Sequence, residues 1–235
     1  MKTSAQLPFE EVEELSLHAL TLAAACQMAA PLFRQPLDPE SARRIAETSV
    51  DDEDDLVLDQ PECREGMHAM KSFCLSLDET NELQASNDFH DLFVGPHKLK
   101  AAPWSSIYLD AGNILFGPTA LRVRKAFAAQ GFAIPEGTAE PADHVAYELQ
   151  FLADMQKRAF MDSDDATVEE RLGSADAAAA FFAEFVSPWI GTFCDRLEQE
   201  AQTEFYRGLA RFARGLTALE GSFFARMADA NAMQG

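Results

Sequence analysis

Apolar side chains recur at helical spacing along most of this 235-residue chain. Residues three, four and seven apart lie on one face of an α-helix, so such stripes predict helices that bury one side. One stripe near the N-terminus consists of Val12, Leu15, Ala19, Leu22 and Cys26. Another near the C-terminus consists of Phe205, Leu209, Phe212, Leu216, Leu219 and Phe223. We therefore predict an all-α fold, with residues 1–235 forming a single globular bundle of about seven to ten helices.

A third stripe, made of Phe182, Phe185, Trp189 and Phe193, crosses Pro188. Proline has no backbone N–H and disrupts a helix interior, so we expect Pro188 to kink or divide this helix. Proline also suits the first position of a helix, as at Pro8, Pro39 and Pro61, and Asp38 is a good cap before Pro39. Gly131 is expected to close a helix that begins near Pro118.

Residues 106–117 alone hint at strands. Ile107-Tyr108-Leu109 and Ile114-Leu115-Phe116 flank a hairpin-like turn at residues 110–113. One hairpin cannot form an independent sheet, so we expect an extended connection or a minor hairpin here. Further along, a candidate hinge at residues 137–141 separates an N-terminal from a C-terminal half, because Gly137 and Pro141 punctuate a short polar stretch.

The chain is strongly acidic, with 39 Asp and Glu against 19 Lys and Arg and a formal net charge of −20. This balance argues against a nucleic-acid binder, which needs cations to displace counterions, and disfavours docking on anionic lipid. Much of the excess lies in residues 38–65, including Asp51 to Asp55, which we expect to be a solvated loop. The charge permits a basic partner without requiring one.

The expected location is the cytoplasm, without stable membrane insertion. Residues 1–14 carry one Lys and four Glu, unlike the basic start of a signal peptide. The most apolar stretch, residues 15–33, contains His18 and Gln27 and is broken by Pro31, which disfavours a membrane span. The cysteines have no CxxC spacing and are predicted to be reduced, buried thiols: Cys26, Cys63, Cys74 and Cys194.

Signatures of common enzyme classes are missing. The sequence has no GxSxG, no phosphate-binding loop, no GxGxxG, no HExxH and no ExxH pair. His144 and Glu148 are four residues apart, but a metal site needs further ligands. Asp143 and His144 could form an acid–base pair, yet no nucleophile is placed to use it. We expect no enzyme, no cofactor and no metal, while a small all-α enzyme or nucleotide-binding protein using Asp143-His144 stays an alternative.

Three motifs in the middle of the chain carry the most information. They read Phe89-x-x-Leu92-Phe93-x-Gly95-Pro96, Pro103-Trp104-Ser105-Ser106-Ile107-Tyr108 and Glu140-Pro141-Ala142-Asp143-His144. Each also has an ordinary structural interpretation. The first is typical of core packing, the second of an anchored loop, and the third of a helix start.

Together these motifs resemble the TorD/DmsD family, the cytoplasmic proofreading chaperones of molybdenum enzymes exported by the twin-arginine pathway. The resemblance covers roughly residues 70–215 and includes residues 113–117, Pro188-Trp189 and the segment from Phe205 to Leu209. The stretch from Leu92 to Asp110 is most similar to the dimethyl-sulfoxide-reductase chaperone branch. Phe89 stands where relatives often have Trp or Tyr.

The resemblance implies an all-α chaperone that is not an enzyme. Its partner would be the twin-arginine signal peptide and precursor of a molybdopterin oxidoreductase, held back from export until cofactor insertion and folding. A chaperone that mainly grips the mature catalytic subunit is an alternative. The resemblance includes monomers and domain-swapped homodimers, and the hinge at 137–141 would permit a swap.

The resemblance also implies which residues bind the leader: Leu92, Phe93, Trp104, Tyr108, Pro141, Asp143 and His144. Our hypotheses for their roles are that the large apolar groups form or support a groove for the apolar part of the leader, and that Asp143 is the first candidate partner for an arginine. His144 would orient Asp143 or donate to leader carbonyls. Phe89, Glu140 and Glu148 are supporting residues, and the two glutamates would widen an acidic mouth.

Overall fold

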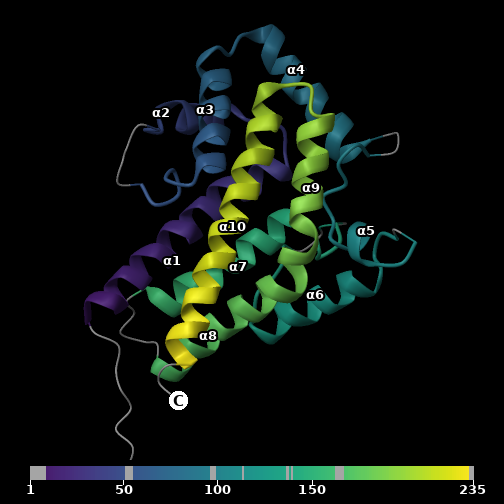
Figure 1. Cartoon of the computed structure of the whole chain (residues 1–235). Coiled ribbons are helices and arrows are strands. Elements are labelled where there is room, and N and C mark those ends of the chain that lie inside the picture. Colours follow the sequence, from purple (N-terminus) through teal and green to yellow (C-terminus); the bar gives the residue numbers. More distant parts are fainter. Residues whose placement is uncertain are drawn as a thin grey trace, which may run out of the picture.

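The computed structural model describes residues 9–50, 55–95, 99–112, 114–135, 138, 140–161 and 167–232. Across these ranges the chain forms ten α-helices (Figure 1): α1 (Phe9–Ala29), α2 (Pro39–Glu47), α3 (Pro61–Leu75), α4 (Glu79–Phe89), α5 (Ser106–Leu109), α6 (Pro118–Ala129), α7 (Val145–Phe160), α8 (Val168–Phe181), α9 (Ser187–Glu200) and α10 (Glu204–Ala232). A 3₁₀ turn η1 (Ala30–Phe33) and two π-helical turns, η2 (His90–Val94) and η3 (Phe182–Val186), continue α1, α4 and α8. The predicted all-α bundle is confirmed.

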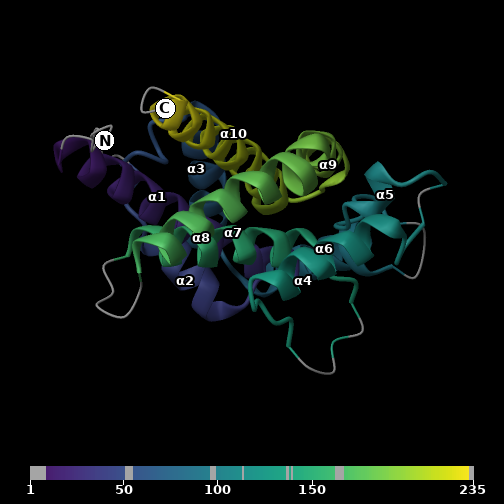
Figure 2. The ribbon, with the colours of Figure 1, turned by 90° about the horizontal axis from the view of Figure 1, so that it is seen from below.

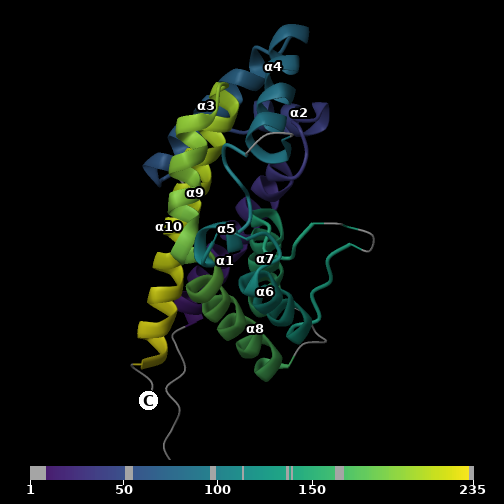
Figure 3. The same ribbon diagram turned by 90° about the vertical axis from the view of Figure 1, so that its right-hand side faces the viewer.

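Two long helices organise the packing. Helix α10 packs mainly on α3 and α9, whereas α7 lies between α1 and α8. Figure 3 shows α2, α3 and α4 at one end of the molecule and α6, α7 and α8 at the other, with α9 and α10 running between them. Seen from below, α5 and α6 lie on the side away from the start of α1 (Figure 2).

The predicted helix boundaries follow from local chemistry. Asp38 accepts hydrogen bonds from the backbone N–H groups of Glu40 and Ser41 and so caps α2, which begins at Pro39. Gly131 follows α6 with φ of 64°, a conformation that glycine adopts without strain. Pro188 lies in the first turn of α9, directly after the π-helical turn, so the helix is divided there as predicted.

The minor hairpin predicted near residues 106–117 is wrong. Ser106–Leu109 is the helix α5, in which the backbone N–H groups of Tyr108 and Leu109 both donate to the carbonyl of Ser105. The described part of the chain contains no strand, and its one isolated β-bridge joins Trp104 to His144. The β-propensity of this segment does not decide its structure, because a hydrogen bond from the Ser106 N–H to Asp143 fixes the start of α5.

Some predictions fall on residues outside those described. These are Pro8, most of the acidic run at 51–55, Pro96, Asn113, and Gly137 and Ala139 of the candidate hinge. The hinge at 137–141 therefore stays a prediction. The four cysteines are all described, and each is free and buried, as predicted.

Helices α3 and α10 cross with almost no space between their backbones. A Cβ atom built on Gly66 of α3 would lie 2.5 Å from the carbonyl oxygen of Gly208 and 2.5 Å from the nitrogen of Phe212, both in α10. The approach is mutual, because a Cβ atom on Gly208 would lie 2.7 Å from the carbonyl oxygen of Gly66. Glycine at both positions is what allows this crossing.

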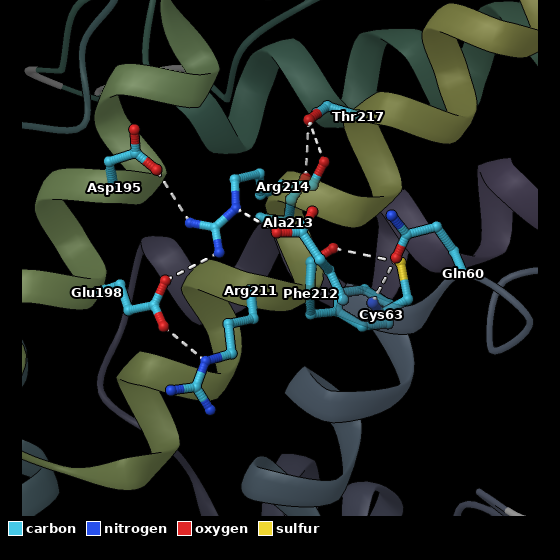
Figure 4. A network of polar contacts seen from close by, with 10 residues as sticks. Gln60, Cys63, Asp195, Glu198, Arg211, Phe212, Ala213, Arg214 and Thr217 are labelled. Carbon is cyan, nitrogen blue, oxygen red and sulfur yellow. Dashed lines mark hydrogen bonds and ion pairs between the residues drawn. The ribbon is translucent and has the colours of Figure 1, made fainter.

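Charged side chains tie the same helices together at the surface (Figure 4). The guanidinium of Arg214 in α10 donates to Glu62 of α3 and to Asp195 and Glu198 of α9, at 2.7, 3.1 and 2.9 Å. Arg211 donates to Glu198 at 2.6 Å. A network of this kind fixes the relative rotation of three helices more firmly than an isolated ion pair does.

Two stretches of the described chain, Glu13–Phe33 and Val168–Glu200, are long and apolar enough to cross a membrane by length and composition. Half of the most apolar part of each stretch is buried inside the bundle. Leu22 and Cys26 from the first and Phe185 and Phe193 from the second are core residues. Core helices of a folded bundle pass the same test, so this is weak evidence for a span.

A buried carboxyl group lies where α1, α7 and α10 meet. Glu220 of α10 accepts a hydrogen bond from the Gln156 amide at 2.6 Å and from the Cys26 thiol at 3.4 Å. The side chain has no exposed surface, and burial raises its pKa from 4.5 to about 7. Near neutral pH this buried carboxyl group is therefore still partly protonated, unlike an exposed glutamate.

We expect the free energy of unfolding to fall as the pH rises from about 4.5 to 7. In this window the folded state holds a proton that the unfolded state has released, so raising the pH favours unfolding. Glu220→Gln should make this fall smaller, while the buried Asp143 and Glu148, whose pKa values are also raised, continue to contribute to it. The substitution should stabilise the protein at pH 8 by on the order of 2 kcal/mol. Urea denaturation at several pH values measures it. The exposed substitution Glu200→Gln should keep the slope, and an unchanged slope in Glu220→Gln would contradict the assignment.

Candidate functional site

Backbone hydrogen bonds join two of the predicted motifs, the one that begins at Pro103 and the one that ends at His144. The N–H of Ser105 donates to the carbonyl of Asp143 at 2.9 Å, and the N–H of Val145 donates to the carbonyl of Pro103 at 2.8 Å. Between these bonds, Trp104 and His144 form the antiparallel bridge, and their rings meet edge to face at 5.7 Å. We call this unit, residues 103–106 with residues 143–145, the α5–α7 clamp.

Asp143 acts inside the clamp. Its carboxylate accepts a hydrogen bond from the backbone N–H of Ser106 at 2.8 Å, at the start of α5. The side chain is fully buried, and burial raises its pKa. Asp143 therefore does not offer a carboxylate at the surface, and its burial speaks against the hypothesis that it pairs with an incoming arginine.

His144 caps α7 in the same unit. Its Nδ1 atom accepts from the N–H of Ala146 at 3.1 Å, and burial lowers the pKa of the ring to about 3. The imidazole is neutral and nearly fully buried, so the structure does not support an accessible acid–base pair with Asp143. No group of three or more metal-ligating side chains occurs among the residues that the structure describes.

The expectation that Glu148 widens an acidic mouth is not met. Glu148 is completely buried in α7 and accepts a hydrogen bond from the Trp189 indole of α9 at 3.1 Å. Burial raises its pKa well above the usual value. Glu140 lies in the connection before α7, which begins at Val145, so the two glutamates do not flank His144 on one helix.

The large apolar residues of the first two motifs are core residues. Phe89, Leu92 and Phe93 are buried, and the ring of Phe93 packs edge to face against Phe89 at 5.2 Å and against Tyr206 at 5.8 Å. Tyr108 is half-buried and lies 5.2 Å from the ring of Trp189. These side chains support the site from inside the bundle and do not line an open groove.

An open apolar groove of about 620 Å³ lies between α6 and the segment that leads into α7. Its lining includes Phe116, Leu121 and Arg124 on one side, and Phe132, Ile134, Glu140 and Pro141 on the other. Phe116 and Leu121 are 60% and 59% exposed, which is unusual for such large apolar side chains. Of the predicted residues, Pro141 and the supporting Glu140 are the ones that line it.

Hydrogen bonds at the start of α6 position one wall of this groove. The Asp110 carboxylate accepts from the hydroxyl of Thr119 at 2.6 Å and from its backbone N–H at 3.1 Å. Residues Phe116 to Pro118 lie between these partners, so the exposed Phe116 belongs to a restrained turn. The sequence pattern of α6 did not reveal this face, because the exposed Leu121 and the buried Val123 are both apolar and are separated by a single basic residue, Arg122.

Glu140 belongs to a cluster at the boundary of the groove. The Arg34 guanidinium forms an ion pair with Glu140, in which Nε of Arg34 lies 3.6 Å from Oε2 of Glu140. The same guanidinium lies 4.9 Å above the centre of the Tyr147 ring. The Tyr147 hydroxyl donates to the same Oε2 atom at 3.2 Å. Arg34 and Tyr147 also line a second cavity of about 410 Å³, together with Asp154.

The family described as "Nitrate reductase delta subunit" matches residues 58–195. Similar curated proteins are named "Chaperone protein TorD". One from Vibrio cholerae serotype O1 (Classical Ogawa) is 29% identical over 67% of this chain and 70% of its own length. Another, from the El Tor Inaba strain, is 30% identical over 56% of this chain and 58% of its own length. One from Photobacterium profundum is 27% identical over 69% of this chain and 75% of its own length. The matches thus span 58% to 75% of the length of these relatives.

Proposed function

Since this chain belongs to the nitrate reductase delta subunit family, the family of the TorD chaperones, we propose that it serves redox-enzyme maturation by binding the twin-arginine leader of a molybdopterin-containing oxidoreductase precursor. It is a chaperone and not an enzyme. In the proposed role it acts in the cytoplasm and holds the precursor back from export until the cofactor is inserted and the enzyme is folded.

The open apolar groove next to Glu140 is the observation that carries this proposal. A twin-arginine leader presents two guanidinium groups followed by an apolar helix. An apolar helix binds by laying its side chains into a hydrophobic groove, and a guanidinium pairs best with a carboxylate. The groove of about 620 Å³ can receive several apolar side chains, and Glu140 supplies a carboxylate in its wall.

Charge orients the leader in this groove. Arg124 of α6 lines one side and Glu140 lines the other, so the arginines of the leader are expected at the Glu140 wall. The adjoining cavity of about 410 Å³ is lined by Asp154, a half-buried side chain. Glu140 and Asp154 thus offer one carboxylate to each of the two arginines.

The buried motif residues are proposed to act on leader binding through the shape of the groove. The α5–α7 clamp fixes the start of α7, and the segment just before it carries Pro141 and Glu140 into the wall. The residues assigned to this supporting role are Leu92, Phe93, Trp104, Tyr108, Asp143 and His144. Phe89 and Glu148 support them through the core and through Trp189.

We expect Leu121→Asp to weaken leader binding at least about tenfold, because the groove then presents a charge to an apolar helix. Isothermal titration with a synthetic peptide of two adjacent arginines followed by an apolar stretch measures the affinity. The matched control is Leu83→Asp in α4, since Leu83 and Leu121 are 62% and 59% exposed. Equal affinities of the two variants, or no binding by the unmodified chain, would contradict the proposal.

The client and the oligomeric state are part of the proposal. The stretch from Leu92 to Asp110 favours a dimethyl-sulfoxide-reductase-like client, which titration against leaders of different oxidoreductases tests. Co-purification with a mature subunit that lacks its leader would instead favour binding of the mature enzyme. Size-exclusion chromatography distinguishes a monomer from a homodimer swapped at residues 137–141.

A further inference from the structure

Arg34 lies at the end of η1, where its backbone N–H donates to the carbonyl of Pro31 at 3.0 Å. Its side chain meets a carboxylate and an aromatic face at once, in Glu140 and Tyr147. These are the two partners that proteins use to hold a guanidinium, by ion pairing and by cation–π contact. The chain therefore contains a complete site for an arginine, and one of its own arginines occupies it.

This site lies at the boundary between the two cavities. Glu140 lines the apolar groove, whereas Arg34 and Tyr147 line the second cavity. Both cavities share the segment that contains Phe132 and Pro135. An arginine that enters the apolar groove therefore meets the Glu140 carboxylate that Arg34 already contacts.

The contact is suited to exchange. The Arg34 and Glu140 side chains are 39% and 35% exposed, so water reaches both partners. Their separation of 3.6 Å is longer than the roughly 2.7–2.9 Å of a tight charged hydrogen bond. Exposed ion pairs with such geometry are weak, so an incoming guanidinium can replace the resident one at low cost.

We propose that Arg34 is an internal competitor that occupies the arginine site, and that the first arginine of the leader displaces it from Glu140 and Tyr147. This inference rests on the proposed function and adds its regulation. An apolar segment without arginines leaves Arg34 in place and forms no ion pair with the Glu140 carboxylate. The exchange thereby makes tight binding depend on arginine as well as on an apolar helix.

The test is a titration of Arg34→Gln with the peptide of two adjacent arginines used above. Removing the competitor is expected to tighten binding about fivefold, because the leader no longer has to break an exposed ion pair and a cation–π contact. Replacing both peptide arginines by lysine should reduce this gain, since lysine lacks the planar group that stacks on Tyr147. Glu140→Gln should weaken binding and abolish the gain in the double variant.

The chain offers a matched control in Arg122. Arg122 pairs with Glu184 and lies 5.1 Å above the ring of Phe185, so Arg122→Gln removes the same kinds of contact and the same charge. The Arg122→Gln variant should bind the leader with the same affinity as the unmodified chain. If the unmodified chain binds and Arg34→Gln binds equally or more weakly, the competitor role is wrong while the proposed function stands. If no variant binds the leader, both are wrong.

Discussion

Gly66→Ala is expected to lower the free energy of unfolding by about 3 kcal/mol. The added methyl carbon would lie 2.5 Å from both the carbonyl oxygen of Gly208 and the nitrogen of Phe212. These are backbone atoms of α10, so no side chain can rotate away, and the helices α3 and α10 must separate. Their separation loosens the largest helix–helix contact of the bundle, and thermal unfolding followed by circular dichroism should show a much lower midpoint.

Two other glycines give a control for the intrinsic effect of the substitution. Gly173 in α8 and Gly191 in α9 also lie within helices, but a Cβ atom on either would have nothing within 4 Å. Alanine there should leave stability unchanged or raise it by about 0.5–1 kcal/mol, because alanine is the better helix former. If Gly66→Ala behaves like these two variants, the close crossing of α3 and α10 is incorrect.

Asp88→Ala is expected to cost about 2–4 kcal/mol of stability. Asp88 is buried at the end of α4, and its carboxylate accepts from the backbone N–H groups of Gln202 and Thr203 and from the Thr203 hydroxyl, the last two at 2.8 Å. These donors lie in the turn between α9 and α10. Removing the carboxylate leaves the two buried donors of Thr203 without this partner, which costs more than the loss of a solvated hydrogen bond.

Urea denaturation with an exposed acid as the control tests this. Asp91 forms an ion pair with Lys100 in which its side chain is 54% exposed, and Asp91→Ala should change the free energy of unfolding by less than about 1 kcal/mol. Asp88→Asn should fall between the two, because an amide keeps one acceptor and offers a donor to N–H groups. A loss in Asp88→Ala as small as that in Asp91→Ala would refute the capping role.

The helices of this fold are predictable from the sequence where the apolar stripe is long. The stripes in α1 and α10, the caps at Asp38 and Gly131, and the division at Pro188 are all local signals, and the structure confirms them. The hairpin prediction fails because residues 106–109 have mixed local preferences. The segment forms a helix because the Ser106 N–H at its start donates a hydrogen bond to Asp143, which is distant in the sequence.

The candidate site is less predictable, for the same reason. Asp143, His144 and Glu148 have the polarity of binding residues, and sequence does not show that α5 and Trp189 cover them. In the opposite sense, Leu121 has the character of a core residue and is exposed in the groove. The pairing of Arg34 with Glu140 has no local signal, because helices from both halves of the chain must be in place before the two side chains meet.

The α5–α7 clamp has a consequence for how new specificities can arise. Because Trp104 and His144 lie side by side, the segment between them begins and ends at one point of the bundle. This segment contains α5, α6 and the residues that line the groove, and it packs into the core through buried residues such as Val123 and Phe127. If the groove binds the leader as proposed, exchanging this segment for that of a related chaperone with the same buried anchors would change the contacts with the client, while the sequences of α1, α3, α9 and α10 stay the same.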